Sequence, residues 1–355
     1  MAKILIKNGR VWDGERFSCV DILTVEENIS SIAPHISEKA DFTYDASGML
    51  VSAGLVDIHT HMRQVSSDEY GIPIDAVCLP FGVTAAVEAS AEKGDGRLLS
   101  AFAVKGAAFV ACRIEHDTAV LDMTERLLHA YGDAGVGVKV FFDRACKELK
   151  STKPLREICA FAHARGKKVL VHCNHSPTTM EEIVDTLQGG DIVTHIYHGG
   201  EHTIADHGYA AYDLAKQKGI VLDAGMAGHV HTDFSVLRNA IEAGYLPDTI
   251  STDITRCSAF YRGGRYGLTM CMSIMRAVGM GEEDILRAVT SHPARALGMA
   301  GKWGCLRVGG TADIAVLDYT QEGFDLTDAA GHHITSKKGY RCALTIADGQ
   351  IVYKH

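Results

Sequence analysis

The 355-residue chain lacks the long apolar runs and the excess of positive charge that would indicate a membrane or nucleic-acid partner. No segment approaches the roughly 18 consecutive apolar residues of a membrane-spanning helix. The first residues, MAKILIKNGRVWDG, have neither the apolar core nor the cleavage signature of a signal peptide. Because 44 acidic residues outnumber 35 basic ones, the net charge of −9 argues against a basic nucleic-acid-binding surface. We therefore expect a cytoplasmic protein without membrane or nucleic-acid partners.

Cysteine pairs are also missing from the chain. Its ten cysteines are dispersed and form no C-x-x-C pair, which argues against a structural zinc site or a small disulfide framework. Several of them lie in apolar stretches, so we expect reduced and mostly buried side chains. The length allows one large domain and a small second unit, and 46% hydrophobic and 22% charged residues are typical of a globular enzyme.

The two ends of the chain contain short strand patterns, whereas the middle alternates strands with helices. Apolar alternation surrounds Asn8-Gly9 near the start and Asp348-Gly349 near the end, and both dipeptides are typical of hairpin turns. We therefore predict a small β-sandwich domain built from residues 1–54 and 300–355. Residues 55–299 predict a parallel sheet with crossover helices.

Eight strand candidates fall within residues 55–299, and eight parallel strands close a TIM barrel. They are predicted at residues 55–59, 84–88, 108–112, 136–141, 168–171, 191–194, 220–222 and 249–251. The predicted fold class is α/β: a distorted TIM (β/α)8 barrel, with the small β-sandwich built from both termini.

Six potential metal ligands lie at or just beyond the ends of short apolar, β-branched runs: His59, His61, Lys139, His172, His195 and Asp253. In a parallel barrel, the carboxyl ends of all strands meet at the face where catalytic groups lie. Residues two apart in a strand point to the same side, so the two imidazoles of the H-x-H pair can reach one ion. Each side chain alone is more typical of a structural role, but their combination predicts a two-metal hydrolytic centre.

Lys139 is the unusual member, because a protonated lysine has only donors and cannot bind a metal. It lies in the apolar stretch GVGVKVFF, where burial would lower the pKa of its ammonium group. A neutral amine can react with carbon dioxide to give a carbamate with two oxygens. The alternative is a lysine that pairs with a carboxylate or extends to the barrel mouth.

With these motifs, the chain resembles the amidohydrolase superfamily, in the dihydroorotase/hydantoinase-like branch with a carboxylated lysine. The matching stretches follow the expected order along nearly the whole chain: DASGMLVSAGLVDIHTHMR, GVTAAVEAS, GVGVKVFF, VLVHCNHSP, GDIVTHIYHG, DTISTDITR, SHPARALGM and GGTADIAVLD. GDIVTH and STD are most similar to a subgroup often labelled dihydroorotase, adenine deaminase or deacetylase, whose characterised members hydrolyse N-acyl or O-acyl compounds. Residues 223–231 depart from the Gly-His-Gly-rich form expected in that loop, which is expected to contact substrate.

The resemblance implies a role for each candidate ligand. The more buried metal would be held by carboxylated Lys139 together with His59, His61 and Asp253. The more exposed metal would be held by the same carbamate together with His172 and His195. Two divalent ions are implied, with zinc as the first choice because it suits imidazole and carboxylate ligands. A hydroxide between them would attack the scissile carbonyl, and Asp253, as the catalytic base, would pass its proton to the leaving group.

Two arginines are candidates for binding the substrate. Arg63 completes HTHMR, and in dihydroorotase-like enzymes an arginine at this offset binds a substrate carboxylate. Arg256 follows Asp253 by three residues and is a second candidate anion partner. Four more histidines lie near the predicted site, and we expect ordinary loop residues: His198, His202, His229 and His231.

The function we expect is metal-dependent hydrolysis of an acyclic amide or ester, such as an N-acyl amino acid or an acetylated hydroxy acid. A cyclic-amide hydrolase of the dihydroorotase or hydantoinase type is the alternative, favoured by HTHMR but not by STDIT, which differs from the dihydroorotase form TDHAP. A non-catalytic scaffold is more remote, because related scaffolds lack the metal ligands present here. A deaminase is a further possibility, although that branch usually lacks the bridging lysine. The resemblance also suggests a homo-oligomer.

Overall fold

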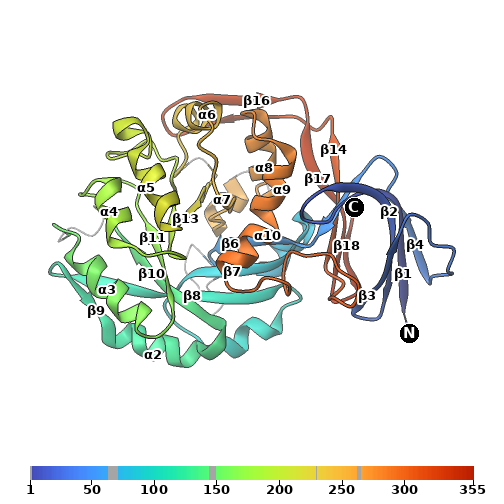
Figure 1. Ribbon diagram of the computed structural model, residues 1–355, viewed down its shortest axis with the longest axis horizontal. Helices are drawn as coiled ribbons and strands as arrows, with labels where there is room; N and C mark the ends of the chain where they lie inside the picture. The colour runs from blue at the N-terminus through green and yellow to red at the C-terminus, as the bar shows by residue number, and fades with distance from the viewer. Residues whose placement is uncertain (1, 63–70, 144–148, 229, 262–264) are drawn as a thin grey trace.

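The structure is a computed structural model that describes residues 2–62, 71–143, 149–228, 230–261 and 265–355. A curled parallel sheet surrounded by helices occupies one side of the molecule, and a mixed sheet made from both termini occupies the other (Figure 1). This arrangement confirms the predicted α/β barrel with a separate sheet domain built from the two ends of the chain.

The parallel sheet has seven strands, each paired with its neighbours in chain order. They are β6 (Leu55–Thr60), β7 (Val83–Ala91), β8 (Lys105–Glu115), β10 (Gly135–Phe141), β11 (Lys168–His172), β12 (Ile192–Thr194) and β13 (Val221–Asp223). A short strand, β9 (Thr118–Val120), pairs antiparallel with the end of β8. Seven of the eight predicted barrel strands are therefore regular strands.

The eighth predicted strand, at residues 249–251, forms only isolated bridges. Thr249 bridges Asp223 of β13, and Ile254 bridges Thr60 of β6, both in parallel. Between these bridges Asp253 adopts a left-handed backbone conformation, with a φ of 48°, which interrupts the extended chain. Because this segment, residues 249–254, pairs with both edges of the sheet, it closes the barrel.

Helices cover the outside of the barrel (Figure 1). The α-helices are α1 (Ile74–Cys78), α2 (Leu121–Tyr131), α3 (Lys153–His163), α4 (Met180–Thr186), α5 (Ala210–Lys218), α6 (Phe234–Glu242), α7 (Arg256–Tyr261), α8 (Leu268–Ala277), α9 (Glu282–Val289) and α10 (Ser291–Ala296). Four 3-10 turns are η1 (Leu79–Phe81), η2 (Gly96–Ala101), η3 (Gly132–Ala134) and η4 (Asp206–Gly208). None of the described helices combines the length and apolar character that crossing a membrane requires.

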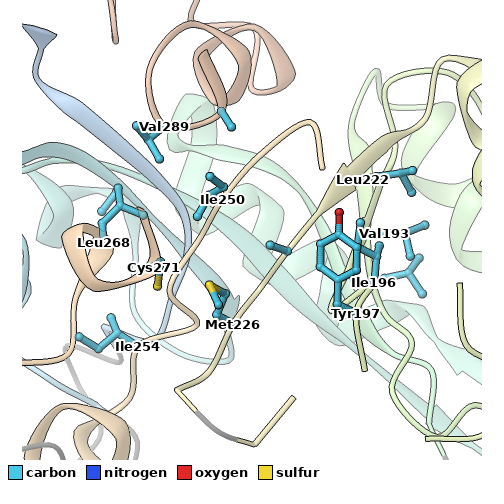
Figure 2. Close-up of a cluster of buried hydrophobic side chains, with 14 of the residues drawn as sticks. Val193, Ile196, Tyr197, Leu222, Met226, Ile250, Ile254, Leu268, Cys271 and Val289 are labelled. Carbon is cyan, nitrogen blue, oxygen red and sulfur yellow. The ribbon is translucent and has the colours of Figure 1, made fainter. Parts of the chain in front are cut away.

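Apolar side chains between the strands and helices fix the strand ends in place. Figure 2 shows Val193 of β12 and Leu222 of β13 in one cluster with Leu268 of α8 and Val289 of α9. All four are completely buried. Burying such a side chain contributes about 1.5–3 kcal/mol, so this packing holds the carboxyl ends of the strands where polar groups gather.

The terminal sheet is built from eight strands of both chain ends. They are β1 (Lys3–Trp12), β2 (Phe17–Val25), β3 (Asn28–Ala33), β4 (Phe42–Asp45), β5 (Leu50–Ala53), β14 (Ile314–Thr320), β17 (Gly339–Ala347) and β18 (Gln350–Lys354). β5 joins the two halves, because it pairs with β1 on one side and β14 on the other. The domain boundaries after residues 54 and 299 stay predictions. A hairpin within the second segment, β15 (Phe324–Thr327) and β16 (His333–Ser336), lies beside α8 of the barrel.

One of the two predicted hairpin turns is wrong. Asp348 and Gly349 do form the turn between β17 and β18, both with positive φ. In contrast, Asn8-Gly9 lies inside β1, where the register with β2 shifts. The left-handed Asn8 creates a bulge there, and its backbone amide donates to the Asp21 carboxylate.

Candidate metal centre

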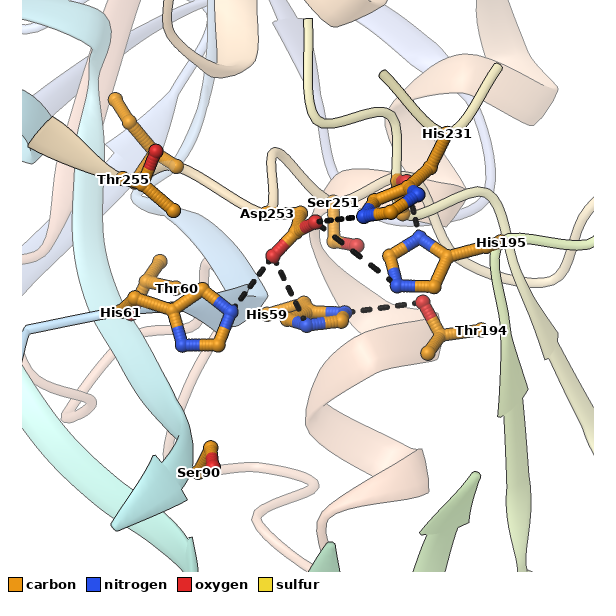
Figure 3. A network of polar contacts seen from close by, with 12 residues as sticks. His59, Thr60, His61, Ser90, Thr194, His195, His231, Ser251, Asp253 and Thr255 are labelled. Atoms are coloured by element: carbon orange, nitrogen blue, oxygen red, sulfur yellow. Dashed lines mark hydrogen bonds and ion pairs between the residues drawn. The ribbon is translucent and has the colours of Figure 1, made fainter. Parts of the chain in front are cut away.

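The carboxyl ends of the barrel strands bring all six predicted ligands into one buried region. His59 lies in β6 and His61 just beyond it, Lys139 lies in β10, His172 ends β11, and His195 follows β12. Asp253 comes from the segment that closes the barrel. All six residues are buried, with exposed fractions of 6% or less. Figure 3 shows three of them, His59, His61 and His195, around Asp253, from elements far apart in the sequence.

The first group of possible ligands consists of His59, His61 and Asp253. Asp253 Oδ1 lies 2.8 Å from His61 Nε2 and 3.2 Å from His59 Nε2. Nζ of Lys139 lies 3.4 Å from the same His59 nitrogen. Two imidazoles and a carboxylate that share one point are a donor set that suits zinc.

The second group consists of His172, His195 and His231. The ring centroids of His172 and His195 are 4.4 Å apart, and the ring of His231 lies 4.4 Å from His195 and 4.9 Å from His172. His231 also links the two groups, because its Nε2 lies 3.7 Å from Asp253 Oδ2. The expectation that His231 is an ordinary loop residue is therefore wrong.

Lys139 is completely buried among these groups. Among the described residues, no carboxylate lies within ion-pair distance of its Nζ, although its neighbours include the Phe141 ring at 5.3 Å. Burial lowers the pKa of Lys139 to about 8, against the opposing influence of Asp253. Within the described part of the chain, Lys139 pairs with no carboxylate, and its complete burial shows that the amine does not extend to solvent.

A chain of hydroxyl and carboxylate groups orients His59. Its Nδ1 lies 3.0 Å from Thr194 Oγ1, and that hydroxyl donates to Asp223 Oδ2 at 2.7 Å. Thr194 can therefore only accept from His59, which places the ring proton on Nδ1. Asp223 accepts two further hydroxyl donors, from Thr249 and Ser251. The result is a bare Nε2 that points toward Asp253 and Lys139, as metal-binding histidines require.

A backbone carbonyl orients His195 in the same way. Its Nδ1 donates to the Gly225 carbonyl at 2.6 Å, which leaves Nε2 bare. Gly225 has a φ of 49°, and a Cβ there would lie 2.2 Å from Thr194 Oγ1 and 2.7 Å from His195 Nδ1. Only glycine fits at this contact.

Several buried polar atoms in the centre have no hydrogen-bond partner among the described residues. They include His172 Nε2, His195 Nε2 and Asp253 Oδ1, whose charged neighbours are Asp143 Oδ2 at 3.2 Å, Asp253 Oδ2 at 3.9 Å and His61 Nε2 at 2.8 Å, none in good hydrogen-bond geometry. A buried polar atom without a partner is destabilising by about 1–3 kcal/mol, so three such atoms in one place call for an explanation. Metal ions would satisfy all three, and the residues present therefore fit two divalent ions.

The members of the first group differ in the direction in which their pKa values are shifted. Burial raises the pKa of Asp253, but the neighbouring His59 and His61 outweigh it and hold that pKa well below the usual range. Burial lowers the pKa of His61, but its contacts with Asp253 and Glu88 outweigh it and raise that pKa to about 9. Burial lowers the pKa of His59 to about 4 and that of His172 to about 3. Without metal, the first group is thus an imidazolium–carboxylate pair beside neutral imidazoles.

Two residues of the centre have a strained backbone. His195 has a φ of 66° and Asp253 a φ of 48°, values that residues other than glycine seldom adopt. Such strain costs about 1–3 kcal/mol at each residue and persists only where the surroundings enforce it. It is typical of functional sites.

Of the two predicted substrate arginines, the structure describes only Arg256. Arg63 lies outside the described residues, as does His229. Arg256 is the first residue of α7, and its side chain is exposed. The groups that sequence reasoning missed are His231 and the orienting residues Thr194, Asp223 and Gly225. Thr194 follows GDIV directly before His195, which was the only signal available for it.

Comparison with known proteins agrees with this geometry. Residues 50–352 match the Amidohydrolase family. A deacetylase from Enterococcus faecalis is 28% identical over 370 aligned positions, which cover 98% of each chain. A solved dihydroorotase superposes with a TM-score of 0.85 at 24% identity, covering 100% of this chain and 98% of the other. A solved adenine deaminase superposes with a TM-score of 0.84 at 26% identity, covering 100% of both chains.

Proposed function

We propose that the chain, which belongs to the Amidohydrolase family of metal-dependent hydrolases, cleaves acyclic amides or esters of small acids. N-acyl amino acids and acetylated hydroxy acids are the substrate class. The similarity to a deacetylase along 98% of both chains supports an acyl substrate. The segment Ser251–Thr255, which differs from the dihydroorotase form, supports an acyclic one.

Two divalent ions are proposed for the two groups of ligands, with zinc as the first choice. His59, His61 and Asp253 would hold the more buried ion, and His172 and His195 the more exposed one. Bound there, metal ions would lower the pKa of a coordinated water to about 7 and polarise a substrate carbonyl. The observation that carries this proposal is the convergence of buried ligand-type atoms that make no hydrogen bond of good geometry: Nε2 of His172, Nε2 of His195 and Oδ1 of Asp253.

Lys139 is proposed to carry a carbamate shared by both ions. Its Nζ lies beside His59, its pKa is lowered to about 8, and no carboxylate among the described residues pairs with it. A larger fraction of the amine is therefore neutral near pH 7 than in an exposed lysine. Only the neutral form reacts with carbon dioxide.

Asp253 is proposed to transfer the proton. Its carboxylate stays ionised because its pKa lies far below neutral, so it can accept a proton. Oδ1 faces His59 and His61, whereas Oδ2 faces His195 and His231 at 3.9 and 3.7 Å. Oδ2 is thus the atom that would receive the proton and then deliver it to the leaving nitrogen or oxygen.

A substrate panel tests this function. Zinc-reconstituted protein is assayed with N-acetyl D- and L-amino acids, O-acetyl hydroxy acids, dihydroorotate and hydantoins. The expected result is turnover of one acyclic series. Turnover of cyclic substrates alone would establish the dihydroorotase-like alternative, and silence across the panel would refute the proposed substrate class.

A further inference from the structure

His231 differs from the other imidazoles of the centre in which nitrogen carries the proton. The side-chain amide of Asn174 donates from Nδ2 to Nδ1 of His231 at 2.8 Å. Nδ1 is therefore an acceptor, and the proton of the neutral ring lies on Nε2. His59 and His195 have the opposite arrangement, with the proton on Nδ1 and a bare Nε2. The same ring type is thus present in two tautomers within one site.

The protonated Nε2 of His231 points into the centre and is available. It lies 3.7 Å from Asp253 Oδ2, beyond hydrogen-bond distance (Figure 3). The side chain is 21% exposed, whereas those of His172 and His195 are 6% and 1% exposed. His231 also lines a cavity of about 230 Å³, together with Asn174, Val230 and Thr232.

The loop that carries His231 is held on both sides of the residue. The Gly228 amide donates to Tyr266 Oη, and that hydroxyl donates to the Thr252 carbonyl, both at 2.6 Å. On the other side, Thr232 Oγ1 donates to the Met226 carbonyl. The bonds through Tyr266 tie the loop to the segment that carries Asp253, and the bond of Thr232 closes the loop on itself. The donor is therefore positioned before any substrate binds, as electrostatic catalysis requires.

We propose that His231 donates a hydrogen bond from Nε2 to the acyl oxygen of the substrate. The ring lies against His195 and His172, the pair proposed to hold the exposed ion, so its N–H is on the side where the polarised carbonyl oxygen would lie. A hydrogen bond from His231 to this oxygen becomes stronger as negative charge develops on the oxygen in the transition state. His231 is thus a catalytic residue and not a third metal ligand. This inference rests on the proposed acyl hydrolysis.

A measurement without substrate tests the tautomer. Nitrogen-15 NMR of zinc-loaded protein labelled in its imidazoles reports the protonation of each ring nitrogen, and the His231→Gln variant assigns the resonances. The expected result is a protonated Nε2 and a bare Nδ1 for His231 alone among the site histidines. A bare or metal-bound Nε2 would overturn the inference, whatever the substrate turns out to be.

Kinetics and metal content test the role. His231→Ala is expected to lower kcat about 100-fold, with KM within about threefold and the zinc content per chain unchanged. His231→Gln keeps an N–H donor and is expected to recover part of the loss. His207, an exposed histidine paired with Glu181, supplies the matched control, and His207→Ala should leave kcat unchanged. Loss of one zinc per chain in His231→Ala, or an unchanged kcat, would overturn the inference.

The Asn174→Asp variant tests the tautomer of His231 while the ring itself is kept. A carboxylate cannot donate to Nδ1, so it would move the proton of His231 from Nε2 to Nδ1. We expect a loss of kcat similar to that of His231→Ala, together with the matching change in the NMR spectrum. A changed spectrum with full activity would refute the proposed hydrogen bond. If the wild-type protein turns over no acyclic substrate, the proposed function fails, and the NMR result still decides whether His231 is a donor.

Discussion

At the scale of single residues, the centre depends on which atoms are left without partners. Thr194 and the Gly225 carbonyl each occupy Nδ1 of one histidine and thereby leave its Nε2 bare. Asp253 keeps its charge because histidines surround it. The proposed ligands, base and donor are therefore distinguished by their hydrogen-bond partners and not by residue type.

Asp253→Asn tests the proposed base. The amide has nearly the same shape but cannot take up a proton at neutral pH, so we expect kcat to fall by about 10²–10⁴. Thermal unfolding should stay within a few degrees of the wild type, because the side chain has almost the same volume. Full turnover in this variant would rule out the role of Asp253.

The raised pKa of His61 predicts that metal binding releases a proton. In the metal-free protein this pKa is about 9, so His61 is protonated at pH 7 and must lose its proton to become a ligand. Its contribution to metal affinity should increase about tenfold per pH unit below pH 9. Calorimetry of zinc binding in buffers of different ionisation enthalpy counts the protons released. His61→Asn should release one proton fewer than the wild type, and equal release would contradict the assignment.

At the scale of elements, four of the described barrel strands end in a proposed ligand, and the packing beneath these ends fixes their positions. The carboxyl ends of β6, β10, β11 and β12 carry ligands, and residues 249–254 carry Asp253 between the two edges of the sheet. The polar side chains of that closing segment bond to buried carboxylates. Thr249 and Ser251 donate to Asp223, and Thr252 donates to Asp57.

Thr194→Val tests the hydroxyl at the end of β12. Valine has a similar shape but leaves the His59 Nδ1–H without an acceptor, so zinc affinity should fall about 10–100-fold. Thr345→Val is the matched control, because that hydroxyl is also buried but bonds the Leu79 carbonyl and Cys342 Sγ, neither of which belongs to the centre. It should lower stability without changing zinc affinity. Equal zinc affinity in both variants would show that Thr194 does not orient the ligand.

Gly137→Ala tests the close packing of β10, two residues before Lys139. A Cβ there would lie 2.4 Å from the Lys168 carbonyl oxygen and 2.5 Å from the Phe109 ring. We expect a loss of about 1–3 kcal/mol in the free energy of unfolding, measured with urea. Gly281→Ala meets only the flexible end of Asp284 at 3.1 Å and should change stability by less than about 0.5 kcal/mol. Equal stabilities would refute the packing argument.

At the scale of the whole molecule, the barrel, its seven regular strands and the six converging side chains could be predicted from apolar runs and their polar ends. The remaining features depend on contacts between residues that are distant in sequence. Asn8 forms a bulge and not a turn because its backbone amide donates a hydrogen bond to the Asp21 carboxylate. His231 reaches the centre because Tyr266 ties its loop to Thr252, 14 residues away from Tyr266 in sequence. No local pattern encodes either contact.

The measurement that tests the central claim most directly is the metal content of the protein at saturation, by equilibrium dialysis against zinc and elemental analysis. Two ions per chain are expected for the wild type and fewer for Lys139→Ala, because that variant loses the proposed shared ligand. Activity should be lost with the metal and partly restored to Lys139→Ala by a short-chain carboxylic acid. A wild-type chain that binds one ion or none at saturation, or an unchanged content in Lys139→Ala, would contradict the two-metal centre.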